Sequence, residues 1–169
     1  MNLSYNMNTS AGLCMEIYQL INSCLVMEDT VAAIYEHFMQ VFPQEKDFWE
    51  DLYKDERNHS SFLMEAAESG KFDEIQPDKL GFSMPQLDRT RKFIENIINS
   101  IKSNPVSLED ALNMALKIEE TFVEAFTNEL IACLSPSDSN TFLQMLMEEK
   151  THIAKIKNMM IEKGFLKLS

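Results

Sequence analysis

The chain has 169 residues, of which 45% are hydrophobic, enough for one domain with a substantial core. Its 27 acidic side chains outnumber the 15 basic ones, and the net charge of −12 disfavours binding to nucleic acid or to anionic membranes. The three cysteines form no Cys-x-x-Cys pair, so the composition indicates neither a disulfide framework nor a cysteine-ligated metal.

Two further features concern the compartment. No Lys or Arg precedes Lys46, so the basic region of a secretory signal is missing. No run of apolar residues approaches the length needed to cross a bilayer. We therefore expect a cytoplasmic protein that binds neither nucleic acid nor membranes.

Apolar residues recur at a spacing near 3.6 residues, and the few Gly and Pro residues interrupt this pattern where helices should end. The pattern predicts an all-α fold with helices at residues 10–41, 45–69, 86–102, 107–134 and 137–163. Ser107, with Asp110 three residues later, resembles a capping box, and Ser135-Pro136 suits another helix start. The short third helix is expected within residues 70–106, a connection that must run the length of a bundle if two helix pairs are to face each other.

The first predicted helix carries a glutamate on its apolar face. Glu28 stands between Cys24 and Val31, where a core residue is expected, so its carboxylate should point inward. Tyr35, two turns further on, shares this face; core packing is one role for it, and a hydrogen-bonding or redox role beside a metal is the other. His37 lies nine residues after Glu28, about 180° round the helix, and should face away.

The second predicted helix contains the tetrad Glu56-Arg57-Asn58-His59, whose first and last residues interrupt the apolar stripe. Positions three apart differ by about 60° on a helix, so Glu56 and His59 can reach one ion from consecutive turns. We interpret Trp49, near the start of this helix, as a packing residue. Asp55 lies one position off the stripe and is expected on a solvated face.

The second half of the chain repeats this set. Glu119 is followed by a second tetrad, Glu149-Lys150-Thr151-His152, in which Glu149 and His152 again interrupt an apolar stripe. The step from Glu28 to Glu56 is 28 residues, and the step from Glu119 to Glu149 is 30. The residue before the second tetrad, Glu148, is also expected on a solvated face.

Four carboxylates in an apolar interior require compensation, because each buried ion costs several kcal/mol. Two divalent cations would supply four positive charges against four carboxylates and two neutral imidazoles. Surface acids on misphased helices, or core histidines hydrogen-bonded to glutamate without a metal, are the alternative; a single Glu-x-x-His would favour it, whereas six residues in duplicated register favour the metal. One Glu from each of two helices and a Glu-x-x-His from each of two others is the ligand list of a dinuclear iron or manganese site in a four-helix bundle.

The segments 28–59 and 119–152 resemble the ferritin-like diiron-carboxylate superfamily, and most closely the rubrerythrin-like diiron domain. As architecture the resemblance covers residues 12–163. It implies one domain over residues 1–169, folded as a ferritin-like four-helix bundle with a long crossover connection that contains a short extra helix. It also implies two iron ions per chain, with manganese as the alternative, bridged by Glu56 and Glu149. Glu28 and His59 would complete the ligands of one ion, and Glu119 and His152 those of the other.

The resemblance implies reduction of hydrogen peroxide or oxygen, with assembly as a homodimer or higher homo-oligomer. The alternatives are a ferroxidase or iron-storage protein, a diiron oxidase acting on an organic substrate, and a degenerate bundle with a structural role only. Three features depart from the relatives. Phe122 replaces the extra carboxylate of rubrerythrins, and Arg57 replaces the haem-ligating Met of bacterioferritins, so no haem is expected. The chain has no rubredoxin-type iron centre, so electrons must come from a separate donor protein.

Overall fold

The computed structural model describes residues 10–70, 84–129 and 136–167, and in parts of four helices it describes the backbone only. Within these residues every regular element is helical, so the predicted all-α fold is confirmed. The predicted helix boundaries agree to within two residues, except that residues 130–134 of the fourth helix lie outside the described chain. The elements are α1 (Ser10–Val41), the short 3-10 helix η1 (Pro43–Glu45), α2 (Lys46–Glu68), α3 (Met84–Ser103), α4 (Leu108–Glu129) and α5 (Pro136–Glu162).

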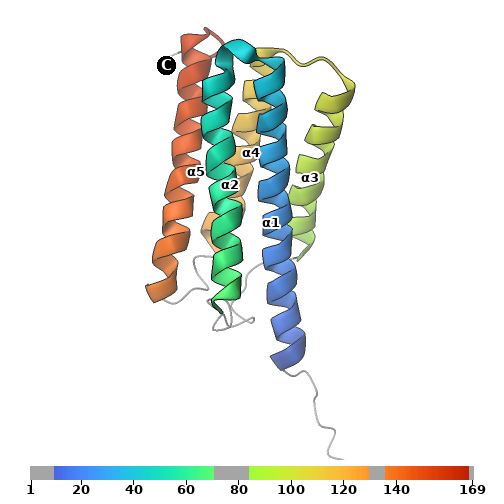
Figure 1. Ribbon diagram of the computed structural model, residues 1–169, viewed down its shortest axis with the longest axis vertical. Helices are drawn as coiled ribbons and strands as arrows, with labels where there is room; N and C mark the ends of the chain where they lie inside the picture. Colours follow the sequence, from blue (N-terminus) through green and yellow to red (C-terminus); the bar gives the residue numbers. More distant parts are fainter. Residues whose placement is uncertain (1–9, 71–83, 130–135, 168–169) are drawn as a thin grey trace, which may run out of the picture.

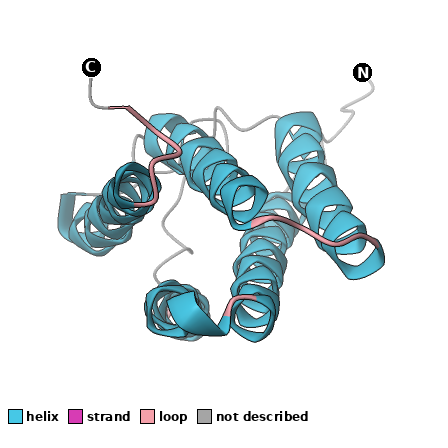
Figure 2. Cartoon of the chain, turned by 90° about the horizontal axis from the view of Figure 1, so that it is seen from above, coloured by secondary structure: helices cyan, strands magenta, loops and turns pink. Residues whose placement is uncertain are grey.

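The helices are arranged as two antiparallel pairs with one additional helix. α1 packs against α2, to which η1 connects it, and α4 packs against α5 (Figure 1). α3 lies along the outer side of α1 and leads at its end into α4 (Figure 1). Seen from above, α1, α2, α4 and α5 surround a common interior, and α3 lies beside them (Figure 2). None of the described helices has both the length and the apolar character that crossing a membrane requires.

Local sequence signals account for the helix ends. The Asp110 amide donates to Ser107 Oγ over 3.1 Å, so the predicted cap of α4 is confirmed. The cap predicted at Ser135 lies outside the described residues. At the end of α5, Gly164 has φ 78° and its amide donates to the Ile161 carbonyl over 3.0 Å. A glycine in the left-handed conformation is the usual helix stop of this kind.

An aromatic cluster joins α1 to α2. Trp49 is fully buried, and its ring centroid lies 4.8 Å from that of Phe38, 4.9 Å from Phe48 and 5.8 Å from Tyr35. The predicted packing role of Trp49 is therefore confirmed. His37 is only partly buried and lines a surface pocket at the end of α1, away from the buried polar residues, as its helical phase predicts.

Candidate metal centre

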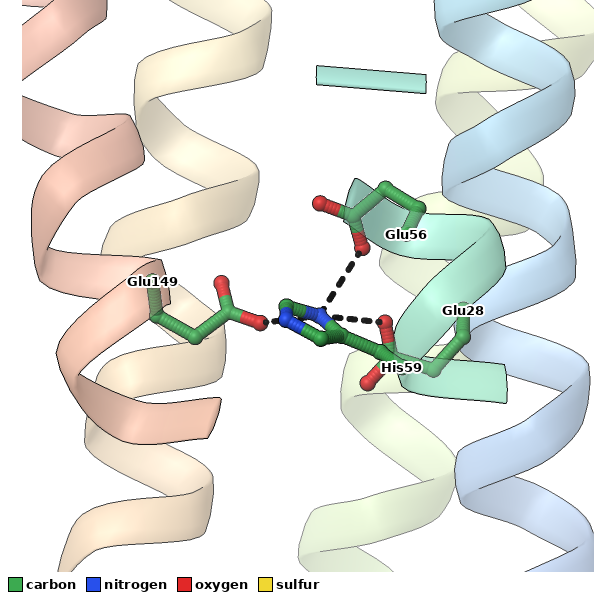
Figure 3. Close-up of side chains that lie close together, drawn as sticks. All are labelled: Glu28, Glu56, His59 and Glu149. Carbon is green, nitrogen blue, oxygen red and sulfur yellow. Dashed lines mark ion pairs between the residues drawn. The ribbon is translucent and has the colours of Figure 1, made fainter. Parts of the chain in front are cut away.

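All six predicted ligands lie together in the interior between the two helix pairs. α1 provides Glu28, α2 provides Glu56 and His59, α4 provides Glu119, and α5 provides the remaining two. Each is at most 2% exposed. They form two groups, and in each group one ligand atom per residue lies within 4.8 Å of all the others: Glu28, Glu56, His59 and Glu149 (Figure 3), and Glu56, Glu119, Glu149 and His152.

Glu56 and Glu149 belong to both groups, and each directs its two oxygens toward different histidines. Glu56 Oε1 lies 3.3 Å from His152 Nδ1, and Oε2 of the same carboxylate lies 3.8 Å from His59 Nδ1. Glu149 Oε1 lies 3.2 Å from His59 Nδ1, and its Oε2 lies 4.0 Å from His152 Nδ1. A carboxylate with one oxygen facing each of two ion positions has the arrangement needed to bridge them.

Most of the inward-facing polar atoms of this cluster have no hydrogen-bond partner. Among the described residues, ten buried side-chain oxygen and nitrogen atoms lack a partner, and eight of these belong to the six predicted ligands. Such an atom costs about 1 to 3 kcal/mol when it is left unpaired in a protein interior. Carboxylate oxygen and imidazole nitrogen together suit divalent first-row transition metals. The cluster could therefore hold metal ions, which would satisfy these atoms.

Without metal, the cluster must balance its charge with protons. Burial raises the pKa of Glu28 and of Glu149 well above the ordinary value, and in Glu149 the neighbouring carboxylates add to this rise. Burial also acts to raise the pKa of Glu56, but contacts with His152 and His59 lower it below its ordinary value. Burial alone would lower the pKa of His152, yet Asp55, Glu119 and Glu56 raise it to about 12. Metal ions would thus displace protons from the cluster.

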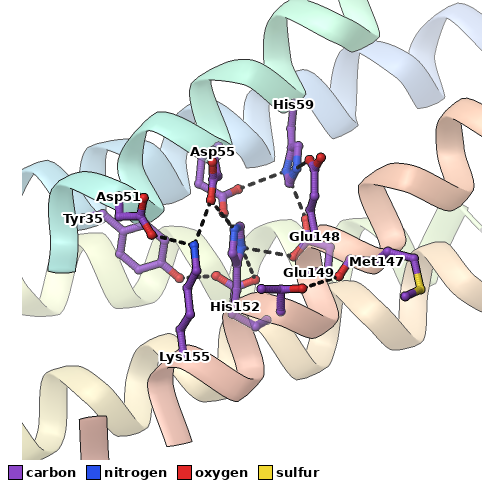
Figure 4. Close-up of polar contacts among 12 residues, drawn as sticks. Tyr35, Asp51, Asp55, His59, Met147, Glu148, Glu149, His152 and Lys155 are labelled. Carbon is purple, nitrogen blue, oxygen red and sulfur yellow. Dashed lines mark hydrogen bonds and ion pairs between the residues drawn. The ribbon is translucent and has the colours of Figure 1, made fainter. Parts of the chain in front are cut away.

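The outer nitrogen of each histidine is held by an acidic residue of the opposite helix pair (Figure 4). His59 Nε2 lies 2.9 Å from Glu148 Oε2, and His152 Nε2 lies 3.0 Å from Asp55 Oδ2. A carboxylate only accepts hydrogen bonds, so each Nε2 carries the hydrogen and, in a neutral ring, Nδ1 keeps its lone pair directed into the cluster. This contact fixes both the tautomer and the orientation of a metal-binding histidine.

The prediction that Asp55 and Glu148 lie on solvated faces is therefore wrong. Their side chains are 31% and 41% exposed, at the border between the buried and the solvated sides of their helices. A residue one position from the inward-facing stripe points toward the neighbouring helix. Here the acidic residue of α2 meets the histidine of α5, and the acidic residue of α5 meets the histidine of α2. The sequence feature that could have indicated these histidine contacts is the acidic residue directly before the glutamate of each tetrad.

Asp55 has a second partner on the surface side. Lys155 Nζ lies 3.3 Å from Asp55 Oδ2 and 2.5 Å from Asp51 Oδ2. The pKa of Asp55 is lowered, chiefly by its contact with His152 and further by Lys155. Asp55 is thus an ionised acceptor for the His152 ring.

The hydroxyl of Tyr35 donates a hydrogen bond to Glu119 Oε1 across the interior. The predicted core packing of Tyr35 is confirmed, since its ring stacks on Trp49, and its hydroxyl in addition bonds one of the predicted ligands. Burial, together with the charge of Glu119 and Glu56, raises the pKa of Tyr35, so the phenol remains a donor. A redox role for Tyr35 stays a prediction.

Arg57, the second residue of the first tetrad, points to the surface. Its Nη1 lies 2.5 Å from Asp29 Oδ1, and Ser60 Oγ donates to the same oxygen over 2.9 Å. The side chain of Phe122 lies outside the described part of the chain.

Asp55→Asn is expected to lower the affinity for a divalent metal by about 10- to 100-fold. The new amide NH₂ can face His152 Nε2, which favours the ring tautomer whose Nδ1 carries a hydrogen and cannot bind metal. Competition with a chromophoric chelator measures the change. Asp51→Asn is the matched control, because it makes the same change one turn away and contacts Lys155 but not His152. An equal loss in both variants would mean that surface charge, not the histidine contact, sets the affinity.

No family model matches this chain, and no curated protein or solved structure is significantly similar to it. A function for the chain has to be inferred from its own residues and their contacts.

Proposed function

We propose that this chain is a ferritin-like diiron-carboxylate protein of the rubrerythrin-like type, which reduces hydrogen peroxide or oxygen with electrons from a separate donor protein. One observation carries the proposal: eight buried polar atoms without hydrogen-bond partners, from six residues on four helices, converge in one interior. Carboxylates and imidazoles in this number match the ligand list of a dinuclear site in a helix bundle.

The proposed fold is a single ferritin-like domain in which α1, α2, α4 and α5 form a four-helix bundle. Residues 70–106 form the long crossover connection, and α3 is its extra helix. The pairing of α1 with α2 and of α4 with α5 supports this arrangement, as does the position of α3 along α1. In such a bundle each helix pair contributes one helix with a single glutamate ligand and one helix with a Glu-x-x-His motif. The two halves of the repeated sequence therefore correspond to the two helix pairs.

In this proposal two iron ions occupy the cluster, and manganese is the alternative metal. Glu56 and Glu149 would be shared by the two ions, because their oxygens divide between the two histidines. Glu28 and His59 would hold one ion, and Glu119 and His152 would hold the other. Two divalent ions balance four ionised carboxylates, and this would replace the protons that neutralise the metal-free cluster.

When bound, two ferrous ions supply two electrons, which together with two protons convert hydrogen peroxide to two molecules of water. The protein residues provide the surroundings for this chemistry. Asp55 and Glu148 hold the two histidines, and Tyr35 holds Glu119. Because the six ligands are almost fully buried, the cluster suits a small oxidant better than a bulky organic substrate.

The electron supply must come from outside this chain in the proposed reaction. The sequence contains no Cys-x-x-Cys pair that could hold a rubredoxin-type iron centre. Reduction of one peroxide molecule takes two electrons, so repeated turnover requires two electrons from a donor for each peroxide. A soluble one-electron carrier such as a rubredoxin has the chemistry of such a donor.

Protein loaded anaerobically with Fe(II) and then desalted is expected to retain about two iron ions per chain by elemental analysis. One equivalent of peroxide should oxidise both ions rapidly, and reduced rubredoxin should restore the ferrous state and allow repeated turnover. The optical absorption of the diferric protein follows each step. Glu120→Gln is a suitable control, since Glu120 neighbours Glu119 in the sequence but pairs with Lys157 on the surface.

The other outcomes separate the alternatives. Retention of many iron ions per chain as an oxygen-driven mineral, with a slow peroxide reaction, would assign the protein to iron storage. Two bound ions that react with neither oxidant would point to an organic substrate or a structural role. One ion per chain, or none, would overturn the dinuclear site itself.

A further inference from the structure

The two terminal glutamates of the cluster differ in their hydrogen bonding. Both oxygens of Glu28 are buried and have no hydrogen-bond partner. In Glu119, by contrast, Oε1 accepts the hydroxyl of Tyr35, and only Oε2 is unpaired. This unpaired oxygen lies 3.4 Å from His152 Nδ1, on the side of the cluster where a metal would bind. The six ligands are therefore arranged symmetrically, but the hydrogen bonds to the two terminal glutamates are not.

The sequence explains this difference. Tyr35 lies seven residues after Glu28, and the equivalent position in the second half, seven residues after Glu119, is occupied by Phe126. Tyrosine supplies a hydroxyl and phenylalanine does not. Tyr35 reaches across from α1 to the glutamate of α4, whereas Phe126 has no group with which to bond Glu28.

The number of oxygens available for a metal follows from these contacts. Glu28 can offer two oxygens to one ion and so act as a chelating ligand. Glu119 favours coordination through Oε2 alone, because the hydrogen bond from Tyr35 directs Oε1 toward the phenol. If each bridging carboxylate gives one oxygen to each ion, the Glu28–His59 position has five protein donors and the Glu119–His152 position has four. Divalent iron, cobalt and manganese accept up to six donors.

We propose that a small anionic oxygen- or nitrogen-donor ligand binds at the Glu119–His152 metal, where the protein leaves two of about six coordination positions open, against one at the Glu28–His59 metal. Tyr35 is the positioning residue, because it withholds one oxygen of Glu119 from the metal. The proposal rests on the dinuclear site proposed above. It distinguishes the two metal positions: the ion at Glu28 and His59 has more protein ligands, and the ion at Glu119 and His152 binds the external ligand.

Cobalt(II) and azide provide the test. Cobalt(II) with four or five donors absorbs visible light more strongly than cobalt(II) with six, so its bands report added ligands. Protein loaded with two cobalt ions per chain is expected to bind one azide per chain, with a change in the bands of one ion only. In Tyr35→Phe, Glu119 is free to chelate, and the azide affinity should fall by about 10- to 100-fold, as when a contact that orients a metal ligand is removed.

Tyr53→Phe is the matched control. It makes the same chemical change in a partly buried tyrosine of α2 for which the described residues show no hydrogen bond to the cluster. Two bound cobalt ions, with normal azide binding in Tyr53→Phe and weakened binding in Tyr35→Phe, support the proposal. Azide that perturbs both ions, binds twice per chain, or binds Tyr35→Phe as it binds wild type overturns it. Failure to hold two cobalt ions would instead count against the dinuclear site.

Discussion

Glu149→Gln is expected to abolish the stabilisation of this protein by metal while leaving the metal-free protein about as stable as wild type. Burial, reinforced by Glu119 and Glu56, raises the pKa of Glu149, which favours the neutral, protonated side chain when no metal is bound. Glutamine has nearly the same shape and is also neutral. Its amide cannot bridge two metal ions as a carboxylate does, so the variant separates the metal role of Glu149 from its packing.

The size of the effect follows from mass action. A metal present at about 1,000 times its Kd stabilises the folded state by about 4 kcal/mol, which is about 8 to 16 °C in Tm for a chain of this length. Thermal unfolding followed by circular dichroism, with chelator and with excess Mn(II), measures both states. Wild type should show this increase, and Glu149→Gln should show almost none of it.

The control for this experiment is again Glu120→Gln, which removes one carboxylate from the surface of α4 where it pairs with Lys157. Its metal-dependent rise in Tm should equal that of wild type. A large fall in the Tm of metal-free Glu149→Gln would show that Glu149 serves an ordinary structural network. A preserved rise with Mn(II) would show that Glu149 is not a ligand.

Trp49→Ala is expected to destabilise the metal-free protein by about 3 to 5 kcal/mol, the usual cost of removing a large buried aromatic side chain. Trp49 is fully buried in the aromatic cluster between α1 and α2. Its indole nitrogen has no hydrogen-bond partner, so truncation leaves no acceptor unpaired and the loss is one of packing. Metal affinity should also fall, because Tyr35, which holds Glu119, stacks on this ring.

Urea unfolding in the presence of chelator measures the packing loss, which corresponds to a fall of about 2 M in the midpoint if the m-value is near 2 kcal/mol/M. Met64→Ala is the control on the same helix, since Met64 is 52% exposed and its removal should cost less than about 0.5 kcal/mol. A cost below about 1 kcal/mol for Trp49→Ala would mean that the cluster rearranges to fill the space.

The sequence by itself determined the helices and the members of the cluster. Apolar residues at a spacing near 3.6, interrupted by Pro43, Gly70 and Pro105, defined the helical segments closely. Glu28 and Glu119 were identifiable because a charged residue inside an apolar stripe has to enter the core. Helical phase is a local property, and it fixes which way a side chain points before any tertiary contact forms.

The tertiary structure alone decided the contacts between helices. Asp55 and Glu148 were predicted to be solvated, because their positions on single helices lie at the edge of the buried face. Their histidine partners come from the other helix pair, about 90 residues away in the sequence. The contact between Tyr35 and Glu119 likewise links α1 to α4 and breaks the symmetry of the repeated ligands. Such contacts depend on how the helices face one another and on which side chains meet there, and the periodicity of one helix carries no information about either.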